Sequence, residues 1–200
     1  MTPVSLGRLA ATLMLAGMVA GCVDAEAEVE LTGSDTARTV VTQAMSADFY
    51  RMLQAEGEDE DGPAGRFCLE GELTETPDGG AICTIAAEGS LRQLARDGQP
   101  FRFTAAEDGL VRIELALADV RAEIGAGETD EAGRRMLEAF FSGRKLTVRF
   151  SGEAVVDTNM DISADGREAT AVLPLLDVIH ESGDWPDVLY AVVEAPRWTM

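Results

Sequence analysis

The chain has 200 residues, enough for one sizeable hydrophobic core or two small ones, and we expect a single domain. Its 36 acidic and 16 basic side chains give a formal net charge of −20. A surface this acidic repels phosphate backbones, so we expect no nucleic-acid partner.

The first 21 residues have the composition of a secretory signal peptide. Arg8 precedes an uncharged apolar run from Leu9 to Ala20, within the roughly 7 to 15 residues of a signal core. A bilayer-spanning helix needs about 20 apolar residues. This run is too short to be one, because acidic side chains begin at Asp24. We therefore interpret residues 1–21 as a signal peptide.

The apolar run ends in Val19-Ala20-Gly21-Cys22, which resembles the bacterial lipobox. The resemblance implies cleavage before Cys22 and attachment of diacylglyceryl/acyl lipid to Cys22, with a thioether at its sulfur; we expect no other cofactor. Each buried methylene contributes about 0.8 kcal/mol, so two or three acyl chains hold a protein durably on a membrane. The alternatives are an ordinary signal peptide with an incidental cysteine, and a buried N-terminal helix.

The lipobox resemblance also implies a location in the bacterial cell envelope. In similar lipoproteins, Asp after the lipidated cysteine favours retention in the inner membrane. Val23 stands there in this chain, which favours the outer membrane, with the protein facing the periplasm.

Cleavage before Cys22 would remove one charged side chain, Arg8. The remaining 15 basic and 36 acidic residues give a formal charge of −21. We expect residues 22–28 to form a short acidic tether and residues 29–200 to form one periplasmic domain. Because so acidic a surface repels anionic lipid headgroups, we expect membrane attachment through the lipid alone.

The first elements of the domain are expected to be two strands and a helix. Apolar alternation begins at Ala27 and continues through Leu31, and a second extended stretch covers residues 37–45. Ser46 can cap a helix over residues 47–54. A polar, solvent-exposed loop is expected at residues 56–65.

Cys68 and Cys83 remain once Cys22 carries lipid, and an exported compartment is oxidising. We predict a disulfide between them, closing a loop of about 15 residues for which the chain-entropy model gives roughly 3 kcal/mol. Thr76-Pro77-Asp78-Gly79-Gly80 lies between them as a strong turn signal. The spacing is not C-x-x-C, so a structural bond that clamps an irregular hairpin is favoured over redox chemistry.

The second half of the chain predicts further strands and two helices. The predicted strands cover residues 101–104, 111–117, 146–150 and 169–173, and the predicted helices cover residues 91–96 and 130–142. Residues 188–193 fit an edge strand or a short helix, and both stay open. Because strands dominate and tight turns join neighbours, we predict an α+β fold, an antiparallel sheet with amphipathic helices packed mainly on one face.

The stretch Phe150-Ser-Gly152-Glu153-Ala-Val-Val-Asp157-Thr-Asn159, with Asp165-Gly166 and the extended residues 169–173 behind it, resembles the late segment of the LppM-type lipoprotein domain. The layout of the early strands behind a lipidated cysteine is also similar. The resemblance implies a fold akin to lipid-binding proteins, without catalytic residues. Members can carry a C-terminal membrane segment, which the residues after Asp187 do not supply.

Catalytic patterns are incomplete throughout the sequence. His180 is the single histidine, the sequence holds no G-x-S-x-G motif, and Asp184 stands where H-E-x-x-H requires its second histidine. We expect His180 to be solvated or hydrogen-bonded. We predict that the chain is not an enzyme.

The acidic patterns do not predict a metal site. Asp157, Asn159 and Asp161 have the opening spacing of a calcium loop, but Ile162 replaces the required glycine and no glutamate closes the loop. In a strand, alternate spacing places such side chains on the solvent face. The run Glu58 to Asp61 is interpreted as part of an exposed loop.

Three hypotheses for function follow. The first is a non-catalytic envelope lipoprotein that binds a lipid or other apolar ligand between sheet and helix. The alternative is an acidic protein-interaction subunit tethered near an envelope complex, in which the negative surface meets a basic partner. The third, an enzyme, lacks a recognisable catalytic motif.

Overall fold

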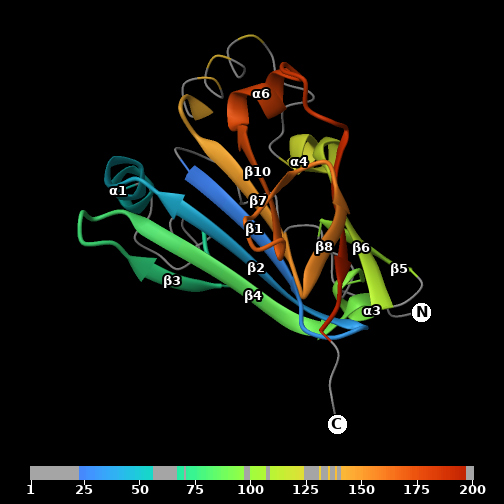
Figure 1. Cartoon of the computed structure of the whole chain (residues 1–200). Coiled ribbons are helices and arrows are strands. Elements are labelled where there is room, and N and C mark those ends of the chain that lie inside the picture. The colour runs from blue at the N-terminus through green and yellow to red at the C-terminus, as the bar shows by residue number, and fades with distance from the viewer. Residues whose placement is uncertain are drawn as a thin grey trace, which may run out of the picture.

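The computed structural model describes residues 23–55, 67–69, 71–96, 100–106, 109–123, 131, 135, 138 and 141–196. Within these ranges the chain forms two sheets and several short helices (Figure 1). The predicted signal peptide, Cys22 and the predicted loop at residues 56–65 lie outside the described residues.

The larger sheet has seven described strands in the order β3-β4-β2-β1-β7-β10-β9. They are β1 (Val23–Leu31), β2 (Thr36–Met45), β3 (Glu72–Glu75), β4 (Ala81–Ser90), β7 (Lys145–Ser151), β9 (Asp161–Ile162) and β10 (Glu168–Pro174). Neighbours are antiparallel except β1 and β7, which run parallel. The predicted antiparallel arrangement therefore holds for most neighbours but not for β1 and β7, because two strands far apart in sequence pair without a hairpin to set their direction.

The smaller sheet has four described strands in the order β5-β6-β11-β8, all antiparallel. They are β5 (Phe101–Ala105), β6 (Leu110–Ala116), β8 (Ala154–Thr158) and β11 (Val188–Glu194). The stretch 188–193, left open between edge strand and helix, is thus an interior strand. The two sheets together give an α+β architecture of mostly antiparallel strands.

Short helices join the strands. They are α1 (Ala47–Ala55), α3 (Leu91–Leu94), α4 (Leu117–Glu123) and α6 (Leu175–His180). The helices predicted at 47–54 and 91–96 are confirmed, and the Ser90 side chain caps α3 by accepting a hydrogen bond from the Gln93 N–H at 3.3 Å. Patterning did not predict α4 and α6, because neither is long enough to show a helical period. Most of the helix predicted at 130–142 lies outside the described residues.

The sheets pack face to face around the main core. Apolar side chains of β1, β7 and β10 meet those of β6 and β11, and the Phe101 and Phe150 rings contact edge to face with centroids 6.1 Å apart. The larger sheet extends beyond the smaller one on the β2-β4-β3 side (Figure 1). There α1 and Phe67 cover a second, smaller cluster that includes Met45 and Cys83.

Gly152 lies where the chain leaves the larger sheet, after β7, and enters the smaller one as β8. A Cβ atom at Gly152 would lie 2.5 Å from Val193 Cγ1 and 2.8 Å from the Glu194 carbonyl oxygen on β11. The Glu153 N–H donates to that same carbonyl at 2.9 Å. The crossing between sheets therefore requires a residue without a side chain.

Replacing Gly152 with alanine is expected to lower the free energy of unfolding by about 1–3 kcal/mol, the usual cost of overpacking a well-packed site. Urea denaturation of wild type, Gly152→Ala, Val193→Ala and the double variant measures it. Because Val193→Ala removes the nearest atom, the two substitutions together should cost less than the sum of each alone. A Gly152→Ala protein as stable as wild type would contradict the close approach.

Candidate functional site

The first described strand starts at the residue after Cys22. β1 begins at Val23, which is paired with Met45 of β2. Residues 23–28, expected as part of a short acidic tether, instead form more than half of the central strand β1. The correction has a physical reason: their acidic side chains occupy alternate positions on one face of the strand, and Ala25 and Ala27 face the packed side.

The start of β1 is fixed by contacts to β7. The Asp24 carboxylate accepts a hydrogen bond from the Lys145 N–H at 3.0 Å and lies 3.4 Å from the Arg144 guanidinium. Further along, Arg149 of β7 pairs with Glu26 and lies 2.8 Å from Glu28, both on β1. A residue joined covalently to Val23 is therefore joined to a firmly paired strand.

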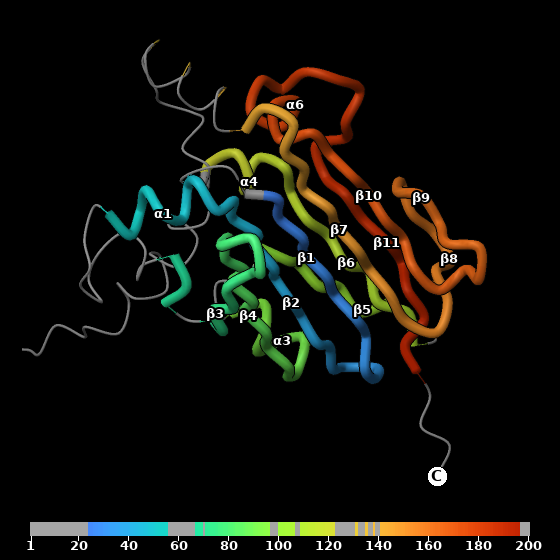
Figure 2. The backbone as a smooth tube through the Cα atoms, turned by 90° about the vertical axis from the view of Figure 1, so that its left-hand side faces the viewer, coloured from blue at the N-terminus to red at the C-terminus, as the bar shows by residue number. Residues whose placement is uncertain are grey.

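Helices and a loop lie at the same end of the molecule as the start of β1 (Figure 2). The Leu175 N–H at the start of α6 donates to the Arg144 carbonyl at 2.9 Å, and the Leu117 N–H at the start of α4 donates to the Asp187 carbonyl at 2.9 Å. Arg121 of α4 lies 3.1 Å from Glu181, just after α6. We call this region, α4, α6 and the loop 181–187, the helical end.

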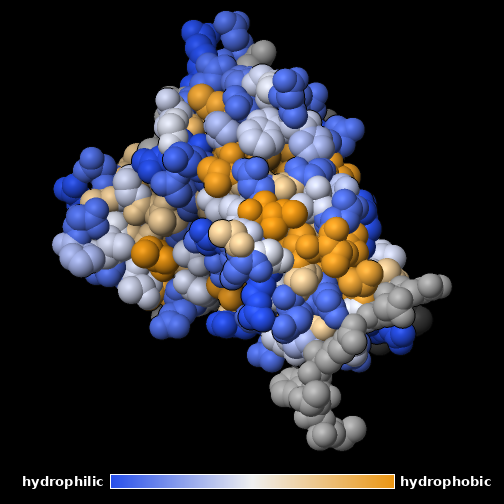
Figure 3. Space-filling view, viewed as in Figure 1, coloured by the Kyte–Doolittle hydropathy of each residue, from blue (hydrophilic) through white to orange (hydrophobic). Residues whose placement is uncertain are grey.

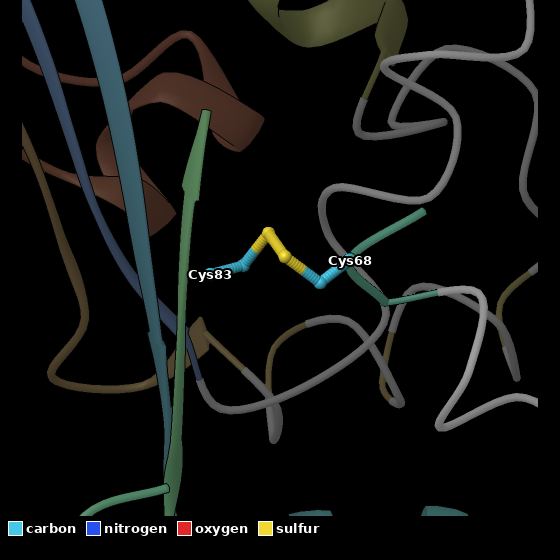
Figure 4. The surroundings of a disulfide bond; sticks show 2 residues. All are labelled: Cys68 and Cys83. Carbon is cyan, nitrogen blue, oxygen red and sulfur yellow. A yellow bond between two sulfur atoms is a disulfide. The ribbon is translucent and has the colours of Figure 1, made fainter. Parts of the chain in front are cut away.

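Cys68 and Cys83 form a disulfide, as the sequence predicted (Figure 4). Their Cα atoms are 5.5 Å apart. Cys83 is a fully buried residue of β4, while Cys68 belongs to the segment before β3. The bond thus ties that segment to β4 and helps cover the small apolar cluster. The loop that it closes contains β3 and the turn into β4.

Two polar side chains are buried between the two apolar clusters. Thr39 and Gln43 of β2 face inward, between Ala37 of the main core and Met45 of the small cluster. The Thr39 hydroxyl donates to the Ala87 carbonyl at 3.4 Å. Gln43 is only 3% exposed, and its Oε1 atom has no hydrogen-bond partner among the described residues. A buried free acceptor costs about 1–3 kcal/mol, so this atom marks a site where a donor from elsewhere would be stabilising.

The residues with calcium-loop spacing are used in strand pairing. The Asn159 side chain donates to the Val188 carbonyl at 2.8 Å and accepts from the Tyr190 N–H at 2.9 Å. Asp157 accepts from the Tyr190 hydroxyl at 3.2 Å. In the part of the chain that the structure describes, no three His, Cys, Asp or Glu side chains are grouped so as to hold a metal ion.

His180 lies at the end of α6 and is partly exposed. Its Nε2 atom is 3.4 Å from the Glu138 carboxylate. His180 and Asp184, the first and last positions of the incomplete H-E-x-x-H pattern, lie on α6 and in the loop after it.

Two aspartates in hairpin turns have lowered pKa values. A hydrogen bond from the Thr76 hydroxyl lowers the pKa of Asp78, and one from the Ser163 hydroxyl lowers the pKa of Asp165. Each aspartate precedes a glycine with positive φ, 86° at Gly79 and 72° at Gly166. These shifts arise from turn geometry, which satisfies the carboxylates locally.

An apolar area lies on one face of the molecule. Figure 3 shows apolar side chains gathered over the region of β8, surrounded by hydrophilic ones. Val156 of β8 and Ile162 of β9 are 54% and 52% exposed. Exposed apolar groups of this kind are typical of contact surfaces when they form a continuous patch.

No helix within the described ranges has the length and apolar character needed to cross a bilayer.

Comparisons with known proteins include a structural neighbour. No family model and no curated protein match the chain. The folded domain of the LppM protein of Mycobacterium tuberculosis, solved by NMR, matches with a TM-score of 0.44 and 10% identity over 90% of this chain and 94% of that one. The neighbour agrees in name with the family that residues 150–173 resemble.

Replacing both cysteines of the disulfide with alanine is expected to lower the free energy of unfolding by about 3 kcal/mol, the chain-entropy value for a loop of about 15 residues. Urea denaturation of Cys68→Ala/Cys83→Ala against wild type measures it. Wild type under a reducing agent should show a similar loss, which separates loss of the bond from loss of packing at Cys83. Equal stability of oxidised and reduced wild type would contradict this role.

Proposed function

We propose that this chain is a non-catalytic lipoprotein of the bacterial cell envelope, held on a membrane by lipid on Cys22. The observation that carries the proposal is the lipobox-like Val19-Ala20-Gly21-Cys22 behind an apolar signal core. The Cys68–Cys83 disulfide supports export, because such bonds persist in oxidising compartments. With those two thiols bonded, Cys22 is the remaining cysteine of the three in the sequence. The residue after it, Val23, favours the outer membrane, with the domain facing the periplasm.

The folded domain is proposed to hold a lipid or another apolar ligand. The supporting observation is the boundary between the two apolar clusters, where the buried Gln43 Oε1 atom has no partner in the described ranges. An apolar ligand carrying one hydroxyl or amide N–H could donate to this acceptor while its hydrocarbon contacts apolar side chains. Gln43 would then orient the ligand and discriminate against fully apolar molecules.

A second candidate is a protein-interaction subunit. It is favoured by the exposed apolar side chains Val156 and Ile162, set in a strongly acidic chain. A partner with an apolar centre and a basic rim would fit such a surface.

The Cys22→Ser protein is expected to lose incorporation of labelled fatty acid, because the thioether can no longer form. Growth of cells expressing the full chain with radiolabelled palmitate, followed by gel analysis and membrane fractionation, measures this. Cys68→Ala/Cys83→Ala serves as the matched control and should keep the label. Undiminished labelling of the Cys22→Ser protein would overturn the proposed anchor.

Native mass spectrometry of the domain, exported with an ordinary signal peptide and Cys22→Ser, is expected to show a bound small molecule that solvent extraction recovers. Gln43→Leu should carry less of it, because the polar contact is lost. Thr42→Val, on the other face of the same strand, is the control and should carry as much as wild type. A ligand-free mass for wild type would reject ligand binding and leave the interaction subunit as the function.

A further inference from the structure

The distance between the proposed lipid and the folded domain is set by the start of β1. Because Val23 already belongs to β1, no flexible linker separates the sheet from Cys22. Consecutive Cα atoms are about 3.8 Å apart, so the acylated residue lies within one residue's length of the sheet. The contacts of Asp24 to Lys145 and Arg144 hold this strand end in place. Lipidated Cys22 would therefore bring this end of the domain against the headgroup layer.

The helical end carries an exposed indole. Trp185, in the loop between α6 and β11, is 38% exposed. A Cβ atom at Gly183 would lie 3.1 Å from the Trp185 ring, and Gly183 has φ +91°, so the loop backbone packs closely beneath the indole. Tryptophan is enriched at membrane–water interfaces, because its ring is apolar and its N–H is polar.

The negative charge of the helical end opposes its binding to an anionic membrane. Asp177, Asp184 and Asp187 lie on α6 and in its following loop. Such a group repels anionic headgroups, and one indole contributes too little to offset several like charges in a membrane of that kind. Contact of the helical end with lipid therefore depends on the length of the anchor.

We infer that the helical end is a membrane-facing surface, with Trp185 at the level of the lipid headgroups. The lipid anchor holds it there because no flexible linker lies between the lipidated residue and β1. The inference rests on the proposed lipidation of Cys22. The occupant of this surface is the lipid layer that holds the acyl chains. The opposite end, with the β1–β2 turn at Ser34, then points away from the membrane, since β1 rises about 3.3 Å per residue and spans roughly 26 Å.

Fluorescence quenching tests the orientation. The full lipidated chain is purified from bacterial membranes and reconstituted in phosphatidylcholine vesicles that contain a headgroup-proximal nitroxide lipid. Trp198→Phe leaves Trp185 as the single tryptophan, since the chain has two. The matched control is Ser34→Trp in a Trp185→Phe/Trp198→Phe background, which moves the single indole to the far end. Quenching of Trp185 is expected to be several-fold stronger than quenching of the indole at position 34.

A linker variant tests whether the anchor imposes the contact. Val-(Gly-Ser)₆ inserted between Cys22 and Val23 keeps valine after the cysteine and adds a flexible reach of about 20 Å. Trp185 quenching should fall towards that of the position 34 control. Unchanged quenching would show that the domain binds lipid by itself and would overturn the inference.

Vesicle flotation separates failure of the inference from failure of the proposed function. A chain that does not float with vesicles lacks the anchor, which rejects the proposed function and this inference together. A chain that floats, but whose indoles at positions 185 and 34 are quenched equally, has the anchor without the orientation. That result overturns the inference alone.

Discussion

The parallel pairing of β1 with β7 is the constraint on which the rest of the structure depends. β1 lies at the middle of the larger sheet, with β2 paired along one edge and β7 along the other. Without this pairing, β1 and β7 would each expose unpaired backbone groups along one edge. Arg149 strengthens the seam by pairing with acidic side chains of β1 on the outer face of the sheet. Whatever is attached to the residue before β1 is thus attached to the centre of the fold.

Elements encoded by neighbouring residues could be predicted from the sequence. The β5-β6 hairpin follows from alternation around a turn, and α3 follows from the cap at Ser90. The pairing of β1 with β7 could not, because it joins residues more than a hundred positions apart. The division into two sheets could not either, because β6 pairs with β11 across more than 70 positions. The acidic residues at 24, 26 and 28 indicated a tether because charge alone does not reveal which face of a strand is solvated.

Gln43 shows how a site can be missed although the sequence holds a signal. Ala37, Thr39, Val41, Gln43 and Met45 occupy alternate positions of β2, and two of these five are polar. A polar residue on an otherwise apolar face indicates either a satisfied hydrogen bond or a binding contact. Strand propensity conceals this distinction, because threonine favours strands for packing reasons alone. Only the structure separates Thr39, which is hydrogen-bonded, from the Gln43 oxygen, which has no partner in the part of the chain that the structure describes.

The part of the larger sheet that extends beyond the smaller one is the part that the Cys68–Cys83 disulfide crosslinks. β3 is an edge strand whose four residues are all exposed, so it contributes little apolar burial of its own. The small cluster beneath α1 is correspondingly limited, and a crosslink stabilises such a region by restricting its unfolded states. That crosslink persists where the surroundings are oxidising. Because Cys83 is paired in register with Gln43, loosening this region in a reducing compartment would also uncover the boundary between the two clusters.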